Sequence, residues 1–150
     1  MKAWTPIVAL CAVLMVAGCG GSDSSSGEEP TKPKVTVPKG PPPKKLIVEE
    51  VEKGTGATVK PGDEVTVQWI GIQYRSGKEV GSSWSYHEPL TFKTNAGRVI
   101  PGWDRGMTGM KVGGRRKLII PPALAYEDTG TTSIPPNETL VYVVDLLAIK

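Results

Sequence analysis

The sequence predicts an α+β fold, in which an antiparallel sheet of several short strands packs against one short helix. Runs of β-branched and aromatic residues, separated by Gly- and Pro-containing turns, recur from residue 46 to the C-terminus. The connections between these runs are short, which favours antiparallel pairing of neighbouring strands. In the second half of the chain, only residues 103–110 have the spacing of an amphipathic helix. Strands with a separate helix indicate the α+β class.

The predicted strands differ in how they should be buried. Val65, Val67 and Trp69 alternate with less apolar positions, which is the pattern of a half-buried strand. Residues 139–149 are apolar with little interruption, so we expect a central strand that is covered on both faces. The complete set of expected strands comprises residues 46–51, 65–70, 90–92, 115–120 and 139–149.

The predicted helix has a narrow apolar face. Trp103, Met107 and Met110 are spaced i, i+4 and i+7, so they lie on one side of a helix. Gly106 and Gly109 lower the helix propensity, and tertiary packing must therefore hold the segment in place. On periodicity alone, Trp103 is a core residue.

The first 18 residues have the composition of a signal peptide. Lys2 is followed by an apolar run over residues 7–17, which is too short to span a bilayer as a helix. The run ends in Ala17, Gly18 and Cys19, a sequence that resembles the lipobox of bacterial lipoproteins. This resemblance implies a lipid on Cys19 and attachment to a membrane of the bacterial cell envelope, on its periplasmic or extracytoplasmic face. The alternative is an ordinary secretory signal with a chance cysteine.

Residues 19–45 have the composition of a tether. Gly and Ser dominate the first half and Pro the second, and Val35 and Val37 are almost the only apolar residues. Such a segment buries too little apolar surface to offset the entropy lost on ordering. We therefore expect a disordered tether at 19–45 and a folded domain at 46–150.

Charge and metal-ligating residues exclude several classes of function. The formal net charge of +3 is too weak to indicate nucleic-acid binding. A single His and two Cys do not supply the four ligands of a structural zinc site. We expect no cofactor and no metal, and a monomer.

Six motifs follow one another over the predicted domain, at residues 67–71, 77–83, 99–106, 110–117, 120–126 and 134–142. In order and spacing they resemble the FKBP-type peptidyl-prolyl cis-trans isomerase family, over about residues 44–150. The resemblance implies a twisted antiparallel sheet wrapped around one short helix, with a substrate pocket between helix and sheet.

The resemblance also implies the site residues. Trp103 would form the floor of the pocket, the backbone N–H of Ile100 would bind a substrate carbonyl next to the proline, and the hydroxyl of Tyr126 would bind a second carbonyl. These three are the predicted catalytic residues. The predicted substrate-binding residues are Trp69, Val80, Gly81, Leu90, Val99, Ile134 and Tyr142.

An apolar aromatic pocket suits prolyl isomerisation. Rotation about the peptide bond has a barrier of about 18–20 kcal/mol because it breaks amide resonance. The twisted amide has less charge separation than the planar one, so an apolar site favours it without covalent or acid–base chemistry. We expect a foldase that acts on X-Pro bonds, with Pro-containing unfolded or exported polypeptides as partners. The alternative is a weakly catalytic or non-catalytic chaperone, because Gly81 stands where the most active members carry Asp and the loop 128–133 is short.

Overall fold

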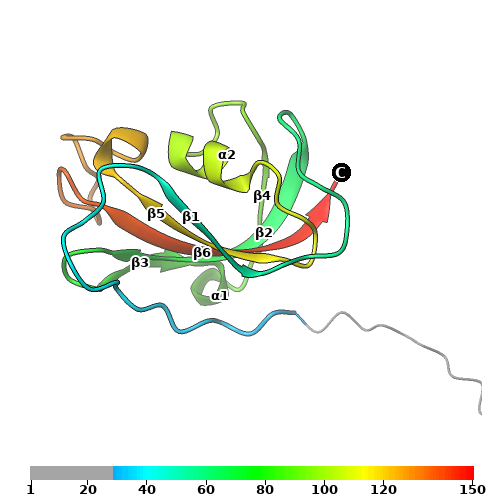
Figure 1. The fold of residues 1–150 in the computed structure, drawn as a ribbon, viewed down its shortest axis with the longest axis horizontal. Helices are drawn as coiled ribbons and strands as arrows, with labels where there is room; N and C mark the ends of the chain where they lie inside the picture. The colour runs from blue at the N-terminus through cyan, green and yellow to red at the C-terminus, as the bar shows by residue number, and fades with distance from the viewer. Residues whose placement is uncertain (1–28) are drawn as a thin grey trace, which may run out of the picture.

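The computed structural model describes residues 29–150, which form a six-stranded sheet with two short α-helices and one 3-10 turn. The strand order is β1-β5-β6-β2-β3, and β4 pairs with β2 as well. Figure 1 shows α2 on one side of the twisted sheet, with α1 and the N-terminal segment on the other side. The elements are β1 (Ile47–Glu52), β2 (Glu64–Gln73), β3 (Glu79–Ser82), α1 (Ser83–Tyr86), β4 (Leu90–Lys93), α2 (Pro101–Met107), β5 (Arg115–Ile120), η1 (Pro122–Leu124) and β6 (Leu140–Ile149).

Two of the predictions concern residues outside this range. The signal peptide at 1–18 and the lipidated Cys19 lie outside the described residues. From residue 29 onward, no helix has the length and apolarity that crossing a bilayer requires.

The α+β class and the antiparallel pairing are confirmed. All five strand pairs are antiparallel. The central position of the last strand is confirmed too, because β6 lies between β5 and β2 and residues 140–146 are buried. One face of β6 lies under α2, and the other face is covered from outside the sheet, so both faces need apolar side chains.

The strand β3 and the helix α1 were not expected from the sequence. β3 has one apolar residue, Val80, and its position is set by pairing with β2 rather than by its own pattern. α1 is a single turn whose N-cap is Ser82, and the hydroxyl of Ser82 accepts a hydrogen bond from the backbone N–H of Ser85 at 3.1 Å. A turn this short has no apolar periodicity to detect.

The helix α2 begins and ends earlier than the predicted range of 103–110. Pro101 fits the first helical position because it needs no amide hydrogen there. Gly106 faces β5, where a Cβ would lie 2.6 Å from Leu118 Cδ2, so only glycine allows this close approach. The chain leaves the helix at Thr108, and Gly109 then adopts a left-handed φ of 78°.

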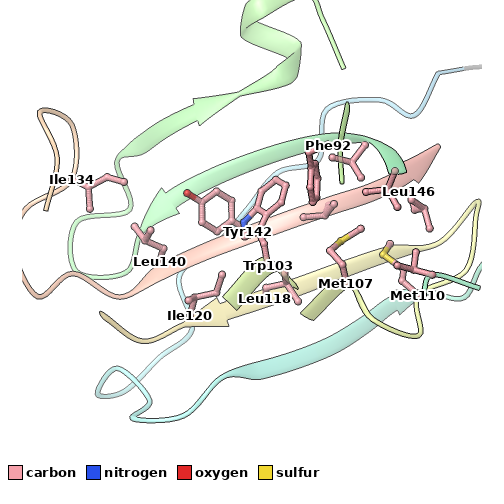
Figure 2. Close-up of a cluster of buried hydrophobic side chains, with 14 residues drawn as sticks. Phe92, Trp103, Met107, Met110, Leu118, Ile120, Ile134, Leu140, Tyr142 and Leu146 are labelled. Atoms are coloured by element: carbon pink, nitrogen blue, oxygen red, sulfur yellow. The ribbon is translucent and has the colours of Figure 1, made fainter. Parts of the chain in front are cut away.

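The main core fills the space between α2 and the sheet. The predicted apolar face is buried there, since Trp103 is 4% exposed and Met107 and Met110 are fully enclosed. Figure 2 shows these side chains pointing toward the strands β5, β6 and β2. We call this group the inner cluster; its buried members are Val59, Val65, Val67, Phe92, Trp103, Met107, Met110, Leu118, Ile120, Ile134, Leu140, Tyr142, Val144 and Leu146.

A smaller outer cluster lies on the opposite face of the sheet. Its buried members are Ile72, Tyr74, Ile119 and Val141, and partly buried Val35 and Val37 pack against them. The structure thus differs from the prediction of a disordered tether for the described part of that range. The two valines that interrupt its polar sequence cover apolar side chains that would otherwise face water.

Polar contacts also hold this N-terminal segment (residues 29–45) to the sheet. The indole N–H of Trp84 donates to the carbonyl of Pro30 at 3.0 Å. Lys32 forms an ion pair with Glu79 of β3, with 3.0 Å between Nζ and Oε2. The segment has no regular secondary structure, so these side chains and the two valines fix its path.

Candidate active site

Three aromatic rings meet between α2 and the sheet. Trp103 of α2 contacts Tyr142 of β6 edge to face, with 5.2 Å between ring centroids and 83° between planes. Trp69 of β2 lies 5.9 Å from each of them. Phe92 of β4 packs 5.7 Å from Trp103 on its other side. Figure 2 shows the Trp103 and Tyr142 rings side by side. Such tilted contacts are the favoured geometry of aromatic pairs.

The sheet register places these rings. Gly71 of β2 pairs with Tyr142 of β6, and a Cβ at Gly71 would lie 3.0 Å from Tyr142 Cζ. Glycine at this point therefore leaves room for the tyrosine ring against β2. Trp69, two residues earlier on the same face of β2, contacts the same ring at an angle of 53°.

The start of α2 presents a free backbone donor. Ile100 is the N-cap of α2, with extended backbone, and its carbonyl accepts from the Trp103 amide at 2.9 Å. Within residues 29–150, the N–H of Ile100 donates to no backbone or side-chain oxygen. A polar hydrogen beside an apolar pocket costs free energy unless a ligand accepts it.

Tyr126 lies in the loop that follows η1. Backbone hydrogen bonds hold this loop; among them, Gly130 N–H donates to the Tyr126 carbonyl at 3.0 Å, and Asn137 N–H donates to the Glu127 carbonyl at 2.7 Å. Glu127 has a left-handed φ of 50°, which turns the chain directly after Tyr126. In the described part of the chain the Tyr126 hydroxyl forms no hydrogen bond with another protein group, so it too is available to a ligand.

These groups line one pocket of about 160 Å³. The three predicted catalytic residues, Ile100, Trp103 and Tyr126, lie in its wall. The remaining lining residues are Trp69, Leu90, Arg98, Val99 and Tyr142, and all except Arg98 were predicted. Arg98 is exposed at the rim. Its place directly before Val99 and Ile100 is the signal that could have indicated it.

Three predicted substrate-binding residues lie outside the lining. Val80 and Ile134 pack into the inner cluster, where they support the pocket from behind. Gly81 is buried beneath other side chains, since a Cβ there would lie 3.0 Å from the Trp69 ring. Without a side chain of its own, Gly81 contributes only shape to the site.

Comparison with known proteins gives the same family as the motifs. The family model for FKBP-type peptidyl-prolyl cis-trans isomerase matches residues 56–147. The chain belongs to this family. An FK506-binding protein of Streptomyces anulatus is 46% identical over 120 residues, which cover 79% of this chain and 97% of that protein. A probable FK506-binding protein of Corynebacterium glutamicum is 40% identical over 117 residues, with 78% and 98% covered.

Solved structures show the same fold. The crystal structure of FkpA from Escherichia coli superposes with a TM-score of 0.65 at 45% identity, over 70% of this chain and 48% of that one. The crystal structure of AtFKBP13 gives a TM-score of 0.65 at 32% identity, over 70% of this chain and 93% of that one. This chain is thus an FKBP-type domain preceded by further residues.

The electrostatics of the FKBP-type pocket favour neutral groups. Burial raises the pKa of the Tyr142 phenol well above its ordinary value, and the neighbouring Tyr126 raises it further. Tyr142 therefore stays protonated at any physiological pH. The enclosed part of the pocket offers aromatic walls and uncharged donors, and Arg98 places its charge at the exposed rim.

Proposed function

We propose that this FKBP-type domain catalyses cis–trans isomerisation of X-Pro bonds in exported proteins, in the pocket lined by Trp69, Trp103, Tyr126 and Tyr142. The convergence of three aromatic rings beside a free Ile100 amide supports the proposal most directly. A proline ring packs well on aromatic surfaces, and the Ile100 N–H can donate to a carbonyl next to the proline.

Catalysis would come from selection of the twisted peptide bond. The Trp103 floor and the Tyr142 wall exclude water from the rotating amide, which disfavours its planar, more polar form. The Ile100 N–H and the Tyr126 hydroxyl would hold the flanking carbonyls while the bond between them turns. Each interaction lowers the barrier only by as much as it favours the twisted state over the planar one.

A second candidate function is that of a weakly catalytic chaperone that holds Pro-containing clients. The observation in its favour is Gly81, which lies behind the Trp69 ring and supplies no polar side chain to the site. Under this alternative, peptides would bind the pocket but turn over little faster than they do without protein.

Turnover of a short X-Pro peptide, followed by NMR exchange, separates the two functions. Trp103→Leu should lower kcat/KM about tenfold or more, which equals about 1.4 kcal/mol of transition-state stabilisation. Tyr126→Phe should lower it by a smaller factor. Trp84→Leu and Tyr74→Phe make the matching changes on the opposite face of the sheet and should leave kcat/KM unchanged. Binding without any rate increase in the unchanged protein would favour the chaperone.

Export and lipid attachment form a separate part of the proposal. They depend on residues 7–19, whose apolar run and terminal Cys19 resemble a lipoprotein signal. Mass spectrometry of the protein from bacterial membranes should show cleavage before Cys19 and an added lipid. Cys19→Ser should release the protein from the membrane fraction, and an unlipidated Cys19 would contradict this part alone.

A further inference from the structure

A second hollow borders the aromatic pocket. Its volume is about 490 Å³, larger than the 160 Å³ of the aromatic pocket. Trp69 and Leu90 line both spaces, so one continuous surface runs from the first into the second. The hollow is completed by Tyr86, Glu88, Pro89 and Thr91.

The helix α1 fixes one wall of this hollow relative to Trp69. The backbone N–H of Trp69 donates to the hydroxyl of Ser83 at 2.8 Å, and that hydroxyl also bonds the side chain of Gln68. Three residues later on α1, the Tyr86 ring lies 6.3 Å from the Trp69 ring at an angle of 50°. Tyr86 is 65% exposed, so it does little for the core and offers its ring to the hollow.

Gly81 makes this arrangement possible. A Cβ at Gly81 would lie 3.0 Å from the Tyr86 hydroxyl oxygen and 3.0 Å from Trp69 Cη2. A side chain at this position would displace the Trp69 ring, the Tyr86 ring or both by a few tenths of an ångström, since both contacts are tighter than ordinary van der Waals distance. The absence of a side chain at Gly81 therefore provides the space that the Tyr86 ring occupies.

Glu88 brings a negative charge to the rim. His87 ends α1 in a left-handed conformation with φ of 55°, and this turn directs the chain outward at Glu88 before β4 begins. Glu88 is exposed, and none of the ion pairs within residues 29–150 involves it. The hollow thus combines two aromatic faces with one carboxylate that has no basic partner in the described chain.

We propose that this hollow binds the side chain directly flanking the substrate proline and that it prefers lysine or arginine there. The proposal rests on the proposed prolyl isomerase function and adds a substrate preference to it. Neighbouring residues of a peptide are about 3.8 Å apart, so a flanking residue can enter the hollow while the proline occupies the pocket. Its methylene stem would pack on Pro89 and Leu90, and its charged head would lie between the Tyr86 ring and Glu88.

Paired peptides test the preference. One series carries Lys, norleucine or Glu directly before the proline, and a second carries them directly after it. Isomerisation is followed by NMR exchange without a coupled protease, because a protease would add a side-chain preference of its own. Lys peptides should give kcat/KM about three- to tenfold above norleucine in at least one series, and Glu peptides should fall below norleucine. High salt should shrink the ratio.

Variants show whether the hollow causes the preference. Glu88→Gln and Tyr86→Ala should each bring the Lys-to-norleucine ratio close to one, and Gly81→Ala should lower it by displacing Tyr86. Glu49→Gln changes an exposed carboxylate on β1 and should leave the ratio as it is. A ratio of one in both series, or a ratio that survives Glu88→Gln, overturns the proposal.

Titration of the same peptides separates this proposal from the proposed function. Tighter binding of Lys than norleucine peptides without any turnover would support the hollow and contradict the isomerase activity. Turnover of norleucine and Lys peptides at equal rates would support the isomerase activity and contradict the preference of the hollow for lysine. Peptides that show no binding at all would contradict both.

Discussion

The two faces of the sheet are covered in different ways. On the inner face, α2 and the loops around it enclose a continuous cluster that includes Trp103, Met107 and Leu118. On the outer face, four buried residues are covered by an extended segment that contributes Val35 and Val37. The inner face is covered by α2, a helix with its own apolar periodicity. The outer face is covered by two valine side chains in a Pro-rich stretch. Sequence patterns reveal the first kind of cover far better than the second.

The N-terminal segment is therefore part of the domain. The match to the Streptomyces anulatus protein covers 120 residues, which is more than residues 46–150 contain, so it includes part of this segment. The segment lies across the sheet from the pocket, so changes in it should alter stability and leave catalysis intact (Figure 1).

The largest effect is expected inside the inner cluster. Met107→Ala removes a fully buried side chain between α2 and the sheet and should lower the free energy of unfolding by about 2–5 kcal/mol. Urea unfolding followed by tryptophan fluorescence measures the change. Val51→Ala, at an exposed position of β1, is the control and should cost less than about 0.5 kcal/mol. An equal cost for both variants would show that the inner cluster is not the main source of stability.

A smaller loss is expected on the outer face. Val35→Ser together with Val37→Ser uncovers Ile72, Tyr74 and Val141 and should lower the free energy of unfolding by about 1–2 kcal/mol. The kcat/KM for X-Pro peptides should stay unchanged, because the pocket lies on the other face. Stability equal to that of the unchanged protein would mean that the segment does not pack on the sheet in solution.

The hydrogen bond between Trp84 and Pro30 should contribute less again. Trp84→Phe keeps an aromatic ring but removes the indole N–H, and it should cost about 0.5–1.5 kcal/mol. In the background of the two valine changes the same substitution should cost little, because the segment is already released. If the cost of Trp84→Phe and the cost of the two valine changes simply add, the two contacts do not depend on the same docked segment.

The smallest effect is expected at the ion pair between Lys32 and Glu79. The hydrogen bond from Lys32 holds the pKa of the Glu79 carboxyl below its ordinary value. The ion pair therefore contributes its full stability at pH values above the ordinary pKa of a glutamate carboxyl. This contribution is lost as the pH falls through the lowered pKa of Glu79 in the folded protein. Both side chains are more than a third exposed, so Lys32→Met should cost about 0.2–1 kcal/mol near neutral pH and nothing in strong acid. A cost that persists in acid would point to packing instead.

The sequence predicted features that depend on neighbouring residues better than features that depend on contacts between separate elements. The apolar spacing of Trp103 and Met107 predicted the buried side of α2, because helical periodicity is local. Met110 is buried too, but it lies beyond the end of the helix. The position of Tyr86 could not be predicted in this way. It depends on the space left by Gly81, which is five residues earlier, and on the Ser83 bond to β2. Neither contact has a periodic pattern in the sequence.

The sequence by itself determined the α+β class, the central apolar strand and most of the residues that line the pocket, because alternation, helical spacing and ordered motifs are properties of short segments. Only the tertiary structure decided which of these side chains lie in the pocket. It moved Val80 and Ile134 into the core, added Arg98 to the rim and joined a second hollow through Trp69 and Leu90. It also brought Val35 and Val37 onto the outer cluster, since burial depends on contacts between residues far apart in the chain.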